Sequence, residues 1–235
     1  MKPESARNLL CKAVISGILI GIGGIVNLSC ENPYMGGFLF SFGLFCIIRY
    51  GFALYTGKVG YIPEQPPVYI REVALTFLGN AVGTALDAFL IRLTRVGTSI
   101  HEKAAACMEV KLADGLLSSL VLGFFCGMLM YLAVDNGKRS TAEGFDTAMV
   151  FGTAVPVMVF IFCKFNHSVA DCFYFFAALE APAQVPQGLL YLLTVVIGNA
   201  LGGMCVPFLK KCVMRSAYCV VSVSGYRRTY FNKAS

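Results

Sequence analysis

The stretch VMVFIFCKFNHSVADCFYFFAA, residues 157–178, decides the fold. It is an apolar run interrupted by Lys164, Asn166, His167, Ser168 and Asp171. Ionisable side chains at membrane depth cost at least about 2.5 kcal/mol each on the insertion scale, so they usually face an internal cavity or another polar group. Non-helical backbone at that depth is tolerated only where protein or a water-filled cavity satisfies its polar groups. We therefore predict that residues 165–171 break a membrane-spanning helix.

The composition of the whole chain indicates an integral membrane protein. Of its 235 residues, 57% are hydrophobic and 14% are charged, and the mean hydropathy is +0.70. About 20 apolar residues cross a bilayer as a helix. Six stretches fit that length, at residues 13–30, 37–56, 73–91, 115–134, 147–163 and 189–209. The first is longer than the apolar core of a signal peptide, so we count it as a span.

These spans leave little chain for anything else. We expect one transmembrane domain over residues 1–235, with its core at 13–210 and tails at 1–12 and 211–235. The net charge is +6, and basic residues gather at both ends. The positive-inside rule therefore predicts that both tails are cytoplasmic in a multi-pass protein of the cell membrane, although Arg92, Arg95, Lys103 and Lys111 would then lie outside. Anionic lipid headgroups, rather than nucleic acid, are the expected partners of the basic tail.

The sequence carries no sign of enzyme chemistry. Its ten cysteines show no CxxC or Cys/His ligand spacing, which predicts small core residues rather than metal ligands. No motif for phosphate binding or nucleophilic catalysis is present. We expect neither a cofactor nor an enzymatic activity.

A short element occurs twice. The sequence GN-x-x-G appears at residues 79–83 and again at 198–202, one intact span after each span that we expect to be broken. In the first half, the break is marked by Thr56 and Gly57. Because each half would have three spans, an odd number, the second half would cross the membrane in the opposite direction to the first. This is the inverted-repeat plan of many transporters, whose substrate site lies near the bilayer midplane.

Several motifs now resemble one family. FSFGL at 40–44 and LYTG at 54–57 look like the FSLGL and LFTG elements of the formate/nitrite transporter family, and FNHSVAD at 165–171 looks like its FEHSxAN element. The resemblance covers roughly residues 13–210. It implies an all-α, aquaporin-like protomer with six transmembrane helices, the second and fifth broken, assembled as a homopentamer in the lipid bilayer. It also implies passage of small monovalent anions or their conjugate weak acids, such as formate, nitrite or hydrosulfide.

The resemblance assigns roles to single residues. His167 would lie mid-pore as a proton or hydrogen-bond donor, a role suited to its near-neutral pKa. Thr56, in the loop with Tyr55, would be a second donor, and Lys111 would attract anions at the mouth. Two apolar constrictions would reject bare ions by dewetting. Phe40 and Leu44 would form one, and Leu54 with Phe160 the other.

The chain departs from the family pattern near the histidine. Asn166 replaces a Glu, Asp171 replaces an Asn, Gly127 stands where an Asn is expected, and Ala53 replaces an acid. We keep Asn166 and Asp171 as pore residues. A relocated acid also favours a cation, so an ammonium/ammonia pore on the same fold is one alternative. The other is a non-transporting membrane protein that docks a partner through its basic tail, residues 215–233.

Two charges lie inside apolar spans outside any family motif. They are Arg49 in the second span and Asp87 in the third. Each alone would be expensive in lipid, so we predict a buried ion pair between them.

Overall fold

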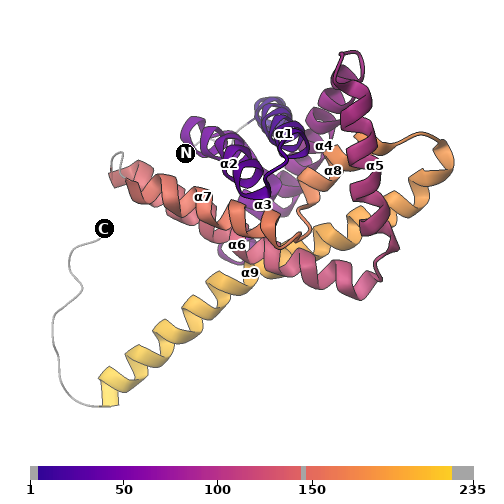
Figure 1. Cartoon of the computed structure of the whole chain (residues 1–235). Coiled ribbons are helices and arrows are strands. Elements are labelled where there is room, and N and C mark those ends of the chain that lie inside the picture. Colours follow the sequence, from indigo (N-terminus) through magenta and orange to yellow (C-terminus); the bar gives the residue numbers. More distant parts are fainter. Residues whose placement is uncertain (1–4, 144–146, 224–235) are drawn as a thin grey trace.

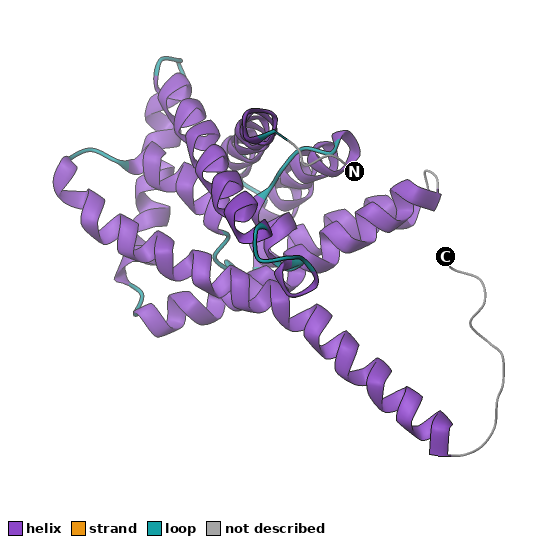
Figure 2. Cartoon of the chain, turned by 180° about the vertical axis from the view of Figure 1, so that it is seen from behind, coloured by secondary structure: helices purple, strands orange, loops and turns teal. Residues whose placement is uncertain are grey.

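The computed structural model describes residues 5–143 and 147–223, and the side chains of residues 5–138 and 150–213 (Figure 1). All regular structure in these ranges is helical, as the view from behind also shows (Figure 2). The α-helices are α1 (Ala6–Ser29), α2 (Pro33–Tyr50), α3 (Tyr55–Val59), α4 (Tyr69–Arg92), α5 (Gly97–Ala113), α6 (Leu116–Glu143), α7 (Thr147–Phe162), α8 (Ser168–Ala178) and α9 (Val185–Val223). Two short 3₁₀ helices, η1 (Ile62–Glu64) and η2 (Pro182–Gln184), lie in connections.

Four helices are long and apolar enough to cross a membrane. They are α1, α4, α6 and α9, the last counted together with η2. Helices α2 and α3 pass the same test as a pair bent by 53°. Helices α7 and α8 are shorter apolar helices on either side of the predicted break. The all-helical class is therefore confirmed, and the count of six spans stays a prediction.

The two largest helix–helix contacts in the described chain are α1 with α4 and α6 with α9. Glycines permit both. A Cβ added at Gly17 would collide with the carbonyl oxygen of Asn80, and one at Gly127 would collide with the carbonyl oxygen of Asn199. Position 127, where the family pattern has an Asn, therefore has no room for a side chain in this helix pair. Small residues at such contacts let helices approach closely in lipid.

The predicted ion pair between Arg49 and Asp87 is wrong. Arg49 is exposed in the last turn of α2, whereas Asp87 is buried on α4 beside Gly21 of α1. No ion pair or hydrogen bond joins Asp87 to any side chain within the described ranges, and its Oδ2 atom has no partner there. The physical reason is packing, because α2 and α4 both contact α1 far more than each other.

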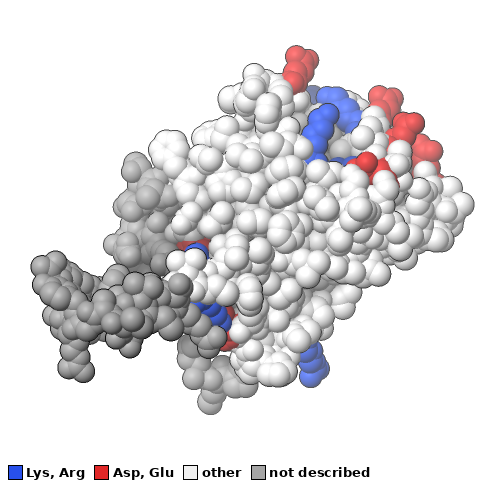
Figure 3. All heavy atoms as spheres, turned by 90° about the horizontal axis from the view of Figure 1, so that it is seen from below, with Lys and Arg blue, Asp and Glu red and all other residues white. Residues whose placement is uncertain are grey.

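The outer surface is largely uncharged. Figure 3 shows one face on which most atoms belong to neither Lys, Arg, Asp nor Glu, with charged side chains gathered near the edges. Large apolar side chains point outward, including Phe42, Phe89 and Leu117, which are 66%, 61% and 74% exposed. Exposure on this scale is unusual for a soluble monomer and fits a surface covered by lipid or by other protein.

Candidate transport site

His167 and Thr56 meet in the protein interior. The Nε2 atom of His167 lies 3.1 Å from the Thr56 hydroxyl oxygen, and each residue is 1% exposed. His167 directly precedes α8, and its Nδ1 accepts a hydrogen bond from the backbone N–H of Ala170. A neutral imidazole has one donor and one acceptor nitrogen. With Nδ1 accepting, the ring carries its proton on Nε2 and points this donor at Thr56.

Asn199 of α9 fixes the chain where α8 begins. Its Oδ1 atom accepts from the backbone N–H of Ser168 at 2.9 Å. Its Nδ2 atom donates to the carbonyls of Asn166 and Gly123, at 2.9 and 2.8 Å. Each polar atom of the buried amide is therefore satisfied by backbone, which positions His167 between two fixed neighbours.

Asn80 of α4 makes the same three contacts in the first half. Its Oδ1 atom accepts from the backbone N–H of Tyr55 at 2.8 Å. Its Nδ2 atom donates to the carbonyls of Ala53 and Ala13, at 2.9 and 2.8 Å. The two GN-x-x-G asparagines thus hold the two helix starts in matching ways, with Thr56 following one clamped residue and His167 preceding the other.

Lys111 at the end of α5 is an ion-pair partner rather than a free cation. Its Nζ atom lies 2.6 Å from Oδ1 of Asn166 and 3.1 Å from Oδ1 of Asp171. The side chains of Lys111 and Asp171 are 13% and 2% exposed. The Tyr191 hydroxyl donates to the other oxygen of Asp171 at 2.8 Å. The acid that appears at position 171 therefore neutralises the lysine predicted to attract anions.

An aromatic layer covers the histidine. The Phe160 ring stacks on the His167 ring, with centroids 5.3 Å apart, and Phe40 packs edge-on to Phe160 at 5.8 Å. These two phenylalanines, which the sequence assigns to separate constrictions, are therefore in contact, and the constrictions themselves stay a prediction. Leu44 and Leu54 are buried in the same core cluster.

Tyr55 is also buried, in the loop that carries Thr56. Its backbone N–H is held by Asn80, and its hydroxyl donates to the carbonyl of Val196 on α9 at 2.9 Å. The tyrosine therefore links the first break to the second half of the chain.

Comparison with known proteins identifies the family. Residues 2–211 match the family model described as formate/nitrite transporter. The chain belongs to the formate/nitrite transporter family. The formate-nitrite transporter of Plasmodium vivax is 25% identical over 231 residues, which cover 83% of this chain and 73% of the relative. The uncharacterized transporter YrhG of Bacillus subtilis (strain 168) is 24% identical, covering 83% and 80%.

Two solved structures share the fold. A pentameric formate channel with formate bound aligns with a TM-score of 0.71 at 22% identity, over 89% of this chain and 97% of that chain. A second structure, described as an FNT family ion channel, aligns with a TM-score of 0.71 at 24% identity, over 84% and 86%. This family membership agrees with the resemblance seen in the FSFGL, LYTG and FNHSVAD motifs.

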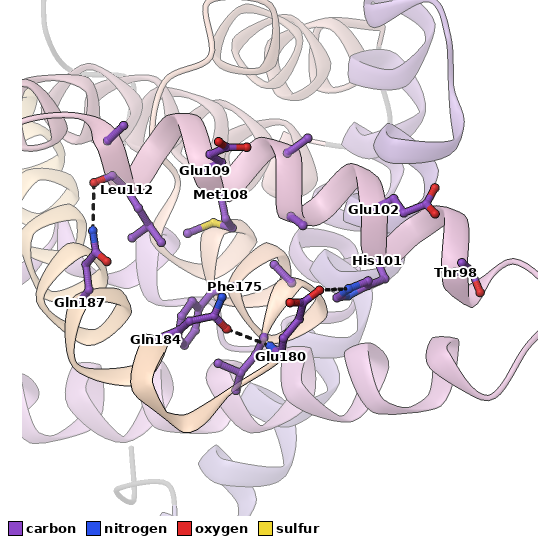
Figure 4. A pocket seen from close by; sticks show the side chains of 15 residues that line it. Thr98, His101, Glu102, Met108, Glu109, Leu112, Phe175, Glu180, Gln184 and Gln187 are labelled. Atoms are coloured by element: carbon purple, nitrogen blue, oxygen red, sulfur yellow. Dashed lines mark hydrogen bonds and ion pairs between the residues drawn. The ribbon is translucent and has the colours of Figure 1, made fainter.

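In this formate/nitrite transporter family member, a cavity of about 910 Å³ lies beside α5 and contains none of the predicted pore residues (Figure 4). At its wall, the His101 ring nitrogens face the carbonyl of Ala177 at 2.8 Å and the Glu180 carboxylate at 2.9 Å. The hydrogen bonds to Ala177 and then Glu180 raise the pKa of His101. The described residues hold no group of three or more His, Cys, Asp or Glu side chains suited to a metal ion.

Sequence reasoning missed three contributors to the site. Asn80 and Asn199 were seen only as parts of a repeated motif, although a buried asparagine beside a helix break is a signal for backbone clamping. For Tyr191 there is no such signal, because nothing in its local sequence distinguishes it from the other 10 of the chain's 11 tyrosines.

Proposed function

We propose that this protein is a channel or transporter for small monovalent anions, or their conjugate weak acids, across the cytoplasmic membrane. The observation that carries the proposal is the buried contact between His167 and Thr56. It presents two hydrogen-bond donors at the meeting point of two helix starts, beneath an apolar layer. The substrate class is that of formate, nitrite and hydrosulfide, in keeping with the family.

We infer a six-span topology built as an inverted repeat. In it, α2 with α3 and α7 with α8 are the two broken spans, and both tails are cytoplasmic. The matched contacts of Asn80 and Asn199 support the repeat, because each clamps the start of a short helix to a neighbouring long one. One solved structure of the same fold is a pentameric formate channel, and we propose a homopentamer for this chain, which would bury part of its exposed apolar surface.

In the proposed mechanism, the anion crosses the apolar layer as the neutral acid. Phe40, Phe160, Leu44 and Leu54, with Tyr55, form a dry filter in which a bare charge is costly. His167 and Thr56 donate hydrogen bonds to the substrate at the centre. His167 serves there as the proton or hydrogen-bond donor of the proposal, through the Nε2 atom that faces Thr56. Lys111 donates to the anion at short range, with Asn166 and Asp171 holding its ammonium group in place.

The contacts of Asp171 weigh against an ammonium pore. Its two oxygens are engaged by Lys111 and Tyr191, so its negative charge is already balanced within the protein. The alternative, in which a partner docks on residues 215–233, concerns side chains that lie outside the described ones.

Uptake by proteoliposomes tests the proposed substrate class. We expect labelled formate, nitrite and hydrosulfide to enter, and uptake to rise as the external pH falls from about 8 to about 5, because more substrate is then protonated. Labelled methylammonium serves as the cationic control and should not enter. Methylammonium uptake without anion uptake would overturn the proposal in favour of the ammonium pore. No uptake of any probe would favour a non-transporting role.

A further inference from the structure

We propose that Lys164 is the residue that draws anions toward the transport site. This inference rests on the proposed function and names the charge that serves it. Lys164 lies two residues after Phe162, the last residue of α7, two before Asn166 and three before His167.

The backbone of Lys164 takes a conformation that suits glycine. Its φ angle is +54°, and the only other positive φ in the described chain is that of Gly51, at +66°. The two residues hold equivalent places. After α2, the N–H of Phe52 donates to the carbonyl of Ile47, and after α7 the N–H of Phe165 donates to the carbonyl of Phe160.

Side chains with a Cβ are disfavoured in this left-handed region, whereas glycine enters it freely. The first half of the repeat uses glycine at this turn, and the second half uses lysine in spite of the strain. Strained residues cluster at functional sites, where the side chain itself has a use. A positive charge is the feature that lysine adds.

That charge is not balanced by contacts. Lys164 is exposed, and among the described side chains it has no ion pair or hydrogen bond. Lys111, by contrast, is neutralised by Asp171. Lys164 stands two residues before Asn166, whose Oδ1 atom lies 2.6 Å from the Lys111 Nζ atom. Lys164 is therefore an uncompensated cation close to Lys111, Asn166 and Asp171, which together form the Lys111 cluster.

A fixed positive charge at a protein mouth raises the local concentration of small anions. We assign this long-range attraction to Lys164. Lys111 keeps the role of donating a hydrogen bond to an anion in direct contact with it. The alternative for an exposed lysine in a membrane protein is a lipid-headgroup anchor, in which the charge has no effect on substrate.

The test is the concentration dependence of formate uptake by Lys164→Gly, Lys164→Asn and Lys164→Arg in proteoliposomes. Glycine and asparagine both accept a positive φ, so these variants should fold at least as stably as the wild type. At low ionic strength, we expect the KM for formate to rise about three- to tenfold in Lys164→Gly and Lys164→Asn, with the maximal rate kept. At high salt, this difference should shrink, and Lys164→Arg should behave as the wild type.

Arg71→Gln is the matched control. It removes an exposed cation from the first turn of α4, at the far end of that helix from Arg92 and α8, and should leave KM unchanged. A KM within twofold of the wild type for both neutral Lys164 variants at low salt would overturn the inference and leave the anchor role. Failure of the proposed function would look different, since the wild type itself would then not take up formate.

Discussion

At the scale of single residues, the Lys111 cluster shows how a motif tolerates a change of residue types. Side chains at positions 166 and 171 both contact the Lys111 ammonium group. The family pattern carries its acid at the first position, and this chain carries it at the second. In this chain Asp171 supplies the counter-charge, and we expect that an acid at position 166 would serve the same ammonium group.

An isosteric exchange tests this equivalence. Asp171→Asn leaves Lys111 buried without a counter-charge and should lower the free energy of unfolding by about 3 kcal/mol. Adding Asn166→Asp returns a carboxylate to the same ammonium and should restore most of the loss. Thermal unfolding in detergent, followed for the two single variants and the double variant, measures the coupling. Additive losses in the double variant would show that the two positions are not equivalent.

The sequence predicted the meeting of His167 with Thr56, because each lies in a motif with an assigned place. It placed Lys111 near the site but missed its pairing with Asp171, because no motif links these two positions. It also put Phe40 and Phe160 in separate constrictions, where the structure joins their rings. Contacts between distant elements depend on packing angles that no local pattern specifies.

At the scale of elements, the two asparagine clamps hold the helix starts at the breaks. Replacing either asparagine by aspartate keeps its shape but turns the donor amide into an acceptor that faces two carbonyls. We expect Asn80→Asp and Asn199→Asp each to lose about 2 kcal/mol of stability, and by similar amounts because their contact sets match. Gln65→Glu, an exposed change of the same chemical kind, is the control. A large effect from only one clamp would contradict the equivalence of the two halves.

A second prediction at this scale concerns pH. Both ring nitrogens of His101 face acceptors, which only the protonated ring satisfies fully, and its pKa is raised above the ordinary 6.5. A group whose pKa is higher in the folded than in the unfolded state adds stability at pH values below its unfolded-state pKa. This added stability is lost as the pH rises through the folded-state pKa. The melting temperature should therefore be lower at about pH 8 than at about pH 6. The change in melting temperature between these pH values should be smaller in His101→Gln than in the wild type. An equal change in that variant would rule out His101 as its source.

At the scale of the whole molecule, hydropathy located every long apolar helix, because the bilayer fixes their length. It did not predict α5, whose residues 97–113 alternate short apolar runs with charges and carry no span-like signal. The predicted Arg49–Asp87 pair is wrong because α2 and α4 are consecutive long helices in the sequence but do not pack against each other. Helix order along the chain does not determine which helices touch.

The exposed apolar surface leads to a prediction about assembly. If part of it is covered by copies of the same chain, native mass spectrometry from detergent should show five protomers of 25.4 kDa each. A monomer as the dominant species, under conditions that preserve transport after reconstitution, would contradict the proposed pentamer.

The central claim is that His167 serves the substrate at the core of the protein. The most direct test is formate uptake across about pH 5 to 8 by His167→Asn, which keeps an acceptor for the Ala170 N–H but removes the imidazole ring that faces Thr56. His101→Gln, at the chain's only other histidine, is the control. We predict at least about a tenfold loss of formate uptake across this pH range in His167→Asn, with normal folding. Wild-type rate and pH dependence in that variant would contradict the account.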